Sequence, residues 1–215
     1  MTHKQFWQDP YQIEHDTIIA SVDGARVTLE STIFFAFSGG QESDHGTIGG
    51  YDVASAVKEN SEIIYNLPDD HKLTPGQSVR IVIDWERRYQ LMRHHFAAEL
   101  VLELFYKAFP KIEKVGAHIA QDKARIDFSW PESISPLLSG FSDEANRMIE
   151  SGLPIKTDFD DKEKERRYWE IEGFSKVPCG GTHVRTTNEI GPIKLKRKNI
   201  GKGKERVEIL LATKS

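Results

Sequence analysis

Glycine-containing turn signals divide residues 1–84 into short stretches, and this spacing constrains the fold more than any other feature of the sequence. Asp-Gly, Gly-Gly and Pro-Gly pairs separate stretches that are rich in β-branched and aromatic residues. We expect strands at 18–22, 26–29, 32–35, 47–53, 61–67 and 78–83. Short strands joined by tight turns are typical of a small closed or half-open β-barrel.

A helical pattern begins after Asp84, a residue that can cap a helix N-terminus. Between Glu86 and Lys107, apolar side chains and one histidine recur at three- and four-residue steps, which predicts a helix with one buried stripe. The stripe consists of Leu91, His95, Ala98, Leu102 and Phe105. Further expected elements are strands at 115–120, 124–128, 153–157, 168–171 and 193–211, a helix at 131–151 and a charged helix at 160–167.

The predicted fold class is therefore α+β. We expect a small β-barrel-like domain at residues 1–84, followed by a two-layer α+β domain at residues 85–215. The chain has 215 residues, of which 38% are hydrophobic, and this is enough for an ordinary core. No signal peptide or membrane-spanning stretch is evident, and a single cysteine excludes an intrachain disulfide, so we expect a cytoplasmic protein.

Cys179 and His183 stand four residues apart in the run Pro-Cys-Gly-Gly-Thr-His, and Cys179 is the only cysteine of the chain. The two glycines let the backbone turn tightly, so a thiolate and an imidazole can both reach one borderline-soft cation such as Zn²⁺. Without further ligands, the commoner interpretation is a buried cysteine near a loop histidine.

A second pair of metal-binding side chains lies on the predicted helix. His95 belongs to the buried stripe, and Glu99 follows it by one turn on the same face, where a carboxylate needs a cation. In the alternative interpretation, His95 is an ordinary core histidine and Glu99 pairs with Arg93 or Lys107. The Cys179/His183 pair favours a metal. The predicted site consists of His95, Glu99, Cys179 and His183.

The loop between Phe37 and Gly46 is the other segment that predicts ligand binding. Gly39 and Gly40 allow the backbone to approach a ligand closely, and Ser38 and Gln41 can form hydrogen bonds. Asp44 can hold the loop by bonding its own backbone. Taken by itself, the segment is only a hairpin loop.

Seven cationic residues lie between positions 194 and 206, against one acid, Glu205. They are Lys194, Lys196, Arg197, Lys198, Lys202, Lys204 and Arg206. Alternating residues on both sides of a Gly-Lys-Gly-Lys turn predict a hairpin with one basic face, which could bind a phosphate backbone. Lysines also blunt exposed sheet edges, and charge alone does not decide between the two roles. The net charge of −4 indicates no general affinity for nucleic acid.

Three segments together resemble one family. They are the loop Phe-Ser-Gly-Gly-Gln-x-x-Asp-x-Gly, the helix start from Asp84 to His95, and Cys-Gly-Gly-Thr-His followed by Glu189-Ile190-Gly191 and Arg206-Val207-Glu208. The combination is similar to free-standing alanyl-tRNA editing proteins of the AlaX type and to the editing domain of alanyl-tRNA synthetase. The resemblance extends from Phe6 to Leu210.

The resemblance implies a hydrolase that removes a wrongly attached amino acid, chiefly serine with glycine as a further candidate, from tRNA(Ala). Family members bind zinc through a His-x₃-His pair and a Cys-x₃-His pair, and here His95, Cys179 and His183 match. Glu99 replaces the second helix histidine, and Phe96 replaces a small or hydroxylated residue. Glu99 is therefore either a zinc ligand or a general base acting on a metal-held water.

The implied roles extend to further residues. Substrate binding is expected from Ser38, Gly39, Gly40, Gln41 and Thr182, and tRNA binding from Lys194, Lys196, Lys198, Lys202 and Lys204. Gln41 and the loop amides would stabilise the developing oxyanion or hold the terminal adenosine. Two other function classes stay open: a tRNA-binding protein with weakened catalysis, and a zinc-dependent hydrolase of small esters or amides. A small-molecule hydrolase would not need the basic hairpin.

Overall fold

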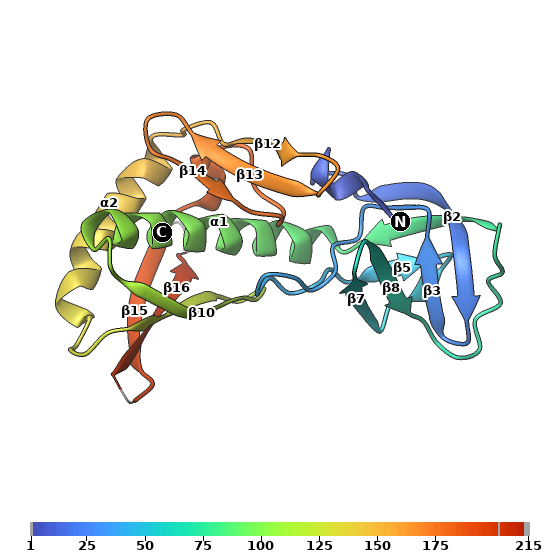
Figure 1. Ribbon diagram of the computed structural model, residues 1–215, viewed down its shortest axis with the longest axis horizontal. Coiled ribbons are helices and arrows are strands. Elements are labelled where there is room, and N and C mark those ends of the chain that lie inside the picture. Colours follow the sequence, from blue (N-terminus) through green and yellow to red (C-terminus); the bar gives the residue numbers. More distant parts are fainter. Residues whose placement is uncertain (1, 202, 213–215) are drawn as a thin grey trace. The chain divides into compact units, whose positions relative to one another are not determined.

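The computed structural model describes residues 2–201 and 203–212 (Figure 1). The chain forms two compact units, Met1–Tyr89 and Gln90–Ser215. A domain boundary after Asp84 stays a prediction. No helix in the described chain has the length and the apolar character that crossing a bilayer requires.

The first unit is a curled half-barrel, as the turn spacing predicts. Its seven-stranded sheet has the order β6-β5-β9-β2-β3-β8-β7, and its core contains Ile19, Phe34, Tyr65 and Ile81. The strands of this unit are β1 (His3–Lys4), β2 (Glu14–Asp23), β3 (Arg26–Leu29), β4 (Ser31–Thr32), β5 (Gly46–Ile48), β6 (Tyr51–Asp52), β7 (Ser55–Glu59), β8 (Glu62–Asn66) and β9 (Ser78–Ile83). The sequence did not predict β7 or the short 3₁₀ helix η1 (Gln5–Trp7).

The long helix α1 (Trp85–Ala108) begins where its cap predicts, because the Asp84 carboxylate accepts the backbone N–H of Arg87 at 3.0 Å. The predicted apolar stripe is buried. Residues outside the stripe, including Met92, Leu100 and Val101, are also fully buried. α1 is thus surrounded by protein on most sides, whereas a single stripe predicts a helix with one solvated face.

Two sheets and a second helix complete the second unit. The four-stranded sheet has the order β10-β11-β16-β15 and the three-stranded sheet the order β12-β13-β14. The elements are β10 (Glu113–Ile119), β11 (Ala124–Ser129), α2 (Ser135–Glu150), β12 (Lys156–Asp161), β13 (Arg166–Ile171), β14 (Ser175–Pro178), the 3₁₀ helix η2 (Thr187–Ile190), β15 (Ile193–Asn199) and β16 (Lys204–Leu211).

α1 lies between these two sheets (Figure 1). On one side, the Phe105 ring packs on Phe128 of β11 with centroids 4.9 Å apart. On the other side, Lys107 donates to the carbonyl of Phe174, which joins β13 to β14, at 2.7 Å. The second unit therefore has three layers, one more than the sequence predicted.

The prediction of a charged helix at residues 160–167 is wrong, because this segment forms the turn of the β12–β13 hairpin. Asp158 pairs with Tyr168, and the Asp161 carboxylate accepts the backbone N–H of Lys164 at 3.1 Å. Glu165 adopts a left-handed backbone conformation with φ of 53°. The helix propensity of the Lys and Glu residues is small per residue, and pairing of the flanking strands outweighs it.

Candidate metal centre

Helix α1 and the loop after β14 bring together three side chains that could hold a metal ion. The ligand atoms of His95, Cys179 and His183 all lie within 4.8 Å of one another. Cys179 Sγ is 3.5 Å from His95 Nε2, and the His95 and His183 rings stack with centroids 4.9 Å apart. Residues 84 positions apart in sequence thus meet at one point.

The loop that carries Cys179 and His183 also orients His95. His95 Nδ1–H donates to the carbonyl of Thr182 at 3.2 Å, which leaves Nε2 directed at the Cys179 sulfur. Metal-binding histidines characteristically donate their second ring N–H to such an acceptor. Thr182 contributes its backbone here, and a substrate-binding role for it stays a prediction.

Glu99 lies with the three ligands. Its Oε1 is 3.4 Å from His95 Nε2 and 3.7 Å from Cys179 Sγ, and its Oε2 accepts the Trp169 indole N–H at 3.3 Å. The alternative partners of this carboxylate make other contacts: Arg93 donates to Ile190, and Lys107 donates to Phe174. Sequence reasoning missed Trp169, because no local pattern relates a strand residue to a helix about 70 residues away.

The charges within the cluster shift the pKa values of its side chains. Burial alone would lower the pKa of His95, but the interactions with Cys179 and Glu99 raise that pKa to about 10. Burial alone would likewise raise the pKa of Glu99, and its hydrogen bond and electrostatic attraction to His95 lower that pKa instead. In the absence of metal, a protonated His95 therefore faces an ionised Glu99.

His183 differs from His95. Its pKa lies well below the ordinary value, first because of burial and then because of repulsion by His95 and Arg167. The side chain is a neutral imidazole, and among the described residues neither ring nitrogen has a hydrogen-bond partner. A buried polar group without a partner is costly unless a ligand satisfies it. Together with a thiolate and a second imidazole, the neutral His183 side chain suits Zn²⁺.

Hydrogen bonds to the backbone hold the Cys-Gly-Gly-Thr-His loop in place. Cys179 N–H donates to the carbonyl of Arg167 at 2.9 Å, and the Arg167 guanidinium donates back to the carbonyl of Gly181 at 3.2 Å. After the loop, the Glu189 carboxylate accepts the backbone N–H groups of Arg185 and Thr186, which caps η2. The Glu-Ile-Gly part of the sequence motif thus fixes the exit of the metal-binding loop.

Arg93 links the helix motif to the Glu-Ile-Gly motif. Its Nε donates to the carbonyl of Ile190 at 2.9 Å, and a Cβ added at Gly191 would come within 2.9 Å of its Nη2. Gly191 also has a φ of +71°, a conformation that favours glycine. The glycine therefore permits a close approach of the arginine.

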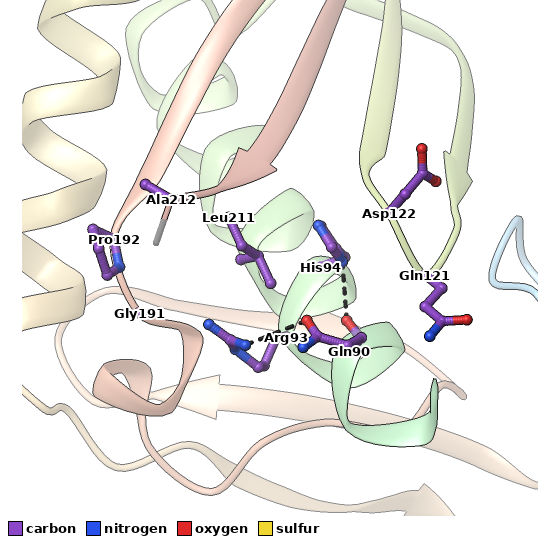
Figure 2. Close-up of a pocket in the computed structure, with 9 residues that line it drawn as sticks. All are labelled: Gln90, Arg93, His94, Gln121, Asp122, Gly191, Pro192, Leu211 and Ala212. Atoms are coloured by element: carbon purple, nitrogen blue, oxygen red, sulfur yellow. Dashed lines mark hydrogen bonds between the residues drawn. The ribbon is translucent and has the colours of Figure 1, made fainter. Parts of the chain in front are cut away.

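A cavity of about 390 Å³ lies beside this contact (Figure 2). Figure 2 shows Arg93 and His94 of α1 in its lining, together with Asp122 from the β10–β11 turn and Leu211 at the end of β16. His94 donates to the Gln90 carbonyl at 3.1 Å. With both a guanidinium and a carboxylate in the lining, the charge of the cavity selects neither anions nor cations. Sequence reasoning did not identify this cavity.

Phe96 is fully buried beside the metal-binding cluster. Its ring makes edge contacts with Trp169 and with His183, at centroid distances of 5.0 and 5.7 Å. The ring thus supports the side chains of the cluster from within the core of the second unit.

The glycine loop lies in the first unit. Ser38 and Gln41 exchange two backbone hydrogen bonds, and Gly39 and Gly40 between them adopt positive φ angles of 61° and 90°. Gln41 is only 1% exposed. The loop is a tight two-residue hairpin, and the catalytic and substrate-binding roles of its residues stay predictions.

Asp44 bonds groups that lie farther away along the chain than the local backbone that the sequence suggested. Its carboxylate accepts the backbone N–H of Phe35 at 2.6 Å and pairs twice with the Arg88 guanidinium, once at 2.8 Å. Both Asp44 and Arg88 are fully buried as side chains. Arg87 adds an ion pair with Glu42 at 2.8 Å.

The basic hairpin forms as predicted from β15 and β16. Lys194, Lys196, Lys198 and Lys204 are exposed, and Lys202 lies outside the described residues. Their contact with tRNA stays a prediction.

The α+β fold and a sulfur- and nitrogen-lined cluster between a helix and a loop define a protein with a candidate metal site. Comparison with known proteins specifies its family. Residues 167–208 match the second additional domain of threonyl and alanyl tRNA synthetases. The alanyl-tRNA editing protein AlaX-M of Pyrococcus horikoshii is 34% identical over 98% of this chain and 98% of its own length. Alanine–tRNA ligases from two strains of Methanococcus maripaludis are 30% and 31% identical over 96% of this chain, which spans 26% of each ligase.

The chain belongs to the AlaX family of alanyl-tRNA editing proteins. Proteins of this family are aminoacyl-tRNA deacylases, and they act on mischarged tRNA(Ala) in trans.

Proposed function

We propose that this protein hydrolyses Ser-tRNA(Ala), with Gly-tRNA(Ala) as a further substrate, and that it does so with a zinc ion held by His95, Glu99, Cys179 and His183. The observation that carries the proposal is the meeting of three ligand atoms within 4.8 Å, with a Glu99 oxygen beside them. Editing by a second site has a physical reason. An amino-acid pocket built for alanine cannot strongly reject an analogue that adds only a hydroxyl.

The bonding of Glu99 supports a role as ligand. One carboxylate oxygen faces His95 and Cys179, while the other is occupied by the Trp169 indole N–H. This leaves a single oxygen for a cation, as in monodentate coordination. Zinc at this site would supply Lewis acidity toward the ester and its attacking water.

Charge distinguishes this site from the usual ligand set of the family. Two anionic ligands, Cys179 and Glu99, would balance the formal charge of Zn²⁺, whereas three histidines and a cysteine leave about one positive charge. We therefore expect Glu99 to lower the electrophilicity of the zinc-loaded site. Before a metal binds, the attraction of Glu99 to the protonated His95 holds the histidine beside it. Thr182 fixes the orientation of His95 through its carbonyl.

The roles proposed for the glycine loop rest on the loop's own geometry. Backbone N–H groups of Gly39 and Gly40 lie at a turn tip whose flanking amides, those of Ser38 and Gln41, are bonded to each other. The two glycine amides are the natural donors of this loop toward an ester oxygen or the terminal adenosine. A cytoplasmic location stays a prediction.

Deacylation of Ser-, Gly- and Ala-charged tRNA(Ala), compared at equal concentration, tests the proposal. We expect serine to be removed roughly ten- to a hundredfold faster than alanine, because a pocket that bonds the serine hydroxyl has unpaired polar groups when alanine enters, at about 1–3 kcal/mol. Equal rates for serine and alanine would contradict an editing role. Full tRNA binding with no deacylation of any ester would identify the catalytically weakened alternative.

A further inference from the structure

One face of the β15–β16 hairpin carries a column of lysines. Lys194, Lys196 and Lys198 are exposed at every second position of β15, and such positions point to the same side of a sheet. The intervening Arg197 lies on the other side, where it binds the buried Glu205 at 2.5 and 2.6 Å. The three lysines therefore project away from the side that carries Glu205.

Cations from interior strands share this outward face. The sheet order is β10-β11-β16-β15. Two lysines of the column each lie directly opposite a residue of β16, which in turn lies opposite a residue of β11, and this gives two rows across the three strands. The rows are Lys198, Arg206, Asp127 and Lys196, Glu208, Arg125. We call this surface the basic face; it comprises Lys123, Arg125, Lys194, Lys196, Lys198, Lys204 and Arg206, with Glu113, Asp127 and Glu208 among them.

The acids of the basic face neutralise only part of its charge. The Asp127 carboxylate accepts hydrogen bonds from Arg206 at 2.7 and 2.9 Å and from Arg125 at 2.5 Å, so one negative charge is shared by two guanidinium groups. Glu208 accepts Lys123 at 3.0 Å.

The lysine column is less fully compensated, although Glu208 lies opposite Lys196 and is attracted to Lys198. In the part of the chain that the structure describes, Lys194, Lys196 and Lys198 form no ion pair. Among the described residues, the basic face thus holds seven cations and three carboxylates, although the whole chain has a net charge of −4. A local excess of positive charge on an acidic protein directs a polyanion to one surface.

We propose that the basic face binds the sugar-phosphate backbone of the tRNA substrate, an inference that rests on the proposed function and extends it to a docking surface. A tRNA is a polyanion whose double-helical parts proteins recognise mostly through shape, phosphate and ribose. An open sheet with exposed ammonium groups at regular spacing meets that requirement without reading sequence.

Edge protection does not account for the whole face. Lysines on β15, the last strand of the sheet, would discourage pairing with another strand. Arg125 and Arg206, however, lie on β11 and β16, which have partners on both sides. The two arginines share the single carboxylate of Asp127, so one positive charge is left over, and on interior strands it has no role in protecting an edge. The two arginines extend the positive surface from the lysine column toward the middle of the sheet.

The test compares two triple variants with the same change in net charge. One carries Lys194→Gln, Lys196→Gln and Lys198→Gln. The control carries Lys156→Gln, Lys162→Gln and Lys164→Gln, three exposed lysines of the β12–β13 hairpin. Binding of uncharged tRNA(Ala) is measured from low to high salt. Each lost phosphate contact should weaken binding by up to about eightfold at 0.1 M salt and reduce the salt slope by about one.

The expected result is weaker binding and a shallower slope in the column variant alone. Equal affinity and slope in the two triple variants would overturn the proposal, and thermal unfolding of both would show that each is folded. The proposed function is judged separately, from deacylation of Ser-tRNA(Ala) by the unmodified protein. Loss of binding in the column variant, with no deacylation by the unmodified protein, would retain the docking surface and reject the catalytic proposal.

Discussion

The two loops that carry most of the sequence motif are held in contrasting ways. In the glycine loop, the buried Asp44 carboxylate bonds both Arg88 and a backbone N–H. In the Cys-Gly-Gly-Thr-His loop, the backbone is fixed by Arg167, but His183 keeps both buried ring nitrogens without a partner among the described residues. Satisfied buried polar groups stabilise a fold, whereas an unsatisfied one indicates a place for a ligand.

The largest expected effect is loss of the metal. Cys179→Ala should reduce the zinc content from about one ion per chain to a small fraction, because it removes the anionic sulfur from a tetrahedral site. Elemental analysis after mild purification measures this. His94→Gln is the matched control, since His94 is a buried neighbour of His95 that bonds Gln90 instead of the cluster. Full zinc content in Cys179→Ala would show that the Cys-Gly-Gly-Thr-His loop does not hold the metal, and the proposed contrast with the glycine loop would fail.

The complementary change in the glycine loop should affect stability and leave the metal in place. Asp44→Asn leaves the Arg88 guanidinium buried without its counter-charge, at a cost of about 3–5 kcal/mol in the free energy of unfolding. Urea unfolding with zinc analysis checks both. Glu42→Gln serves as control, because its ion pair with Arg87 is partly exposed and we expect a change below about 1 kcal/mol. An Asp44→Asn variant that keeps its stability but loses zinc would show that Asp44 supports the metal site and not the stability of the fold.

Changes at Glu99 test whether this helix residue belongs to the ligand set that the Cys-Gly-Gly-Thr-His loop forms with His95. If the carboxylate is a ligand, Glu99→Ala should weaken metal binding, and Glu99→His should keep or tighten it. A loss of roughly ten- to a hundredfold in affinity is typical even for groups that only support a ligand. Metal content and deacylation rate are measured together. A Glu99→Ala protein with full zinc and no hydrolysis would identify Glu99 as a general base, and one normal in both would have neither role.

The smallest effect, per unit of pH, is a dependence of the metal affinity on pH. Without metal, the pKa of His95 is about 10, above the usual 6.5, so its proton must leave before a metal binds. Apparent metal affinity should therefore rise by up to about tenfold per pH unit below pH 10. In metal-free protein the sign is opposite: the stabilisation from protonated His95 is complete below about pH 6.5 and is lost as pH rises toward 10.

Proton release on metal addition, followed by calorimetry in buffers of different ionisation enthalpy, checks this. The His95→Gln variant, which has no imidazole to deprotonate, should release about one proton fewer. Equal proton release by both proteins would show that His95 is already neutral before the metal arrives.

Local sequence patterns predicted much of the fold. The Asp84 cap, the apolar stripe of α1 and the paired strands of the basic hairpin depend on neighbours within a few residues, so their signals are readable in order along the chain. The same locality explains the failure at residues 160–167. A run of Lys and Glu has helix propensity, but strand pairing of β12 with β13 decides its conformation.

The sequence by itself identified His95, Glu99, Cys179 and His183 as candidates, because residue types and spacing are enough to suggest a ligand set. Only the tertiary structure decided that they converge, that Trp169 holds one oxygen of Glu99 and that His183 is buried with no hydrogen-bond partner among the described residues. It also placed Arg125 and Arg206 beside the lysine column. Contacts of this kind join segments many residues apart, and they depend on chain closure and packing, which no local pattern contains.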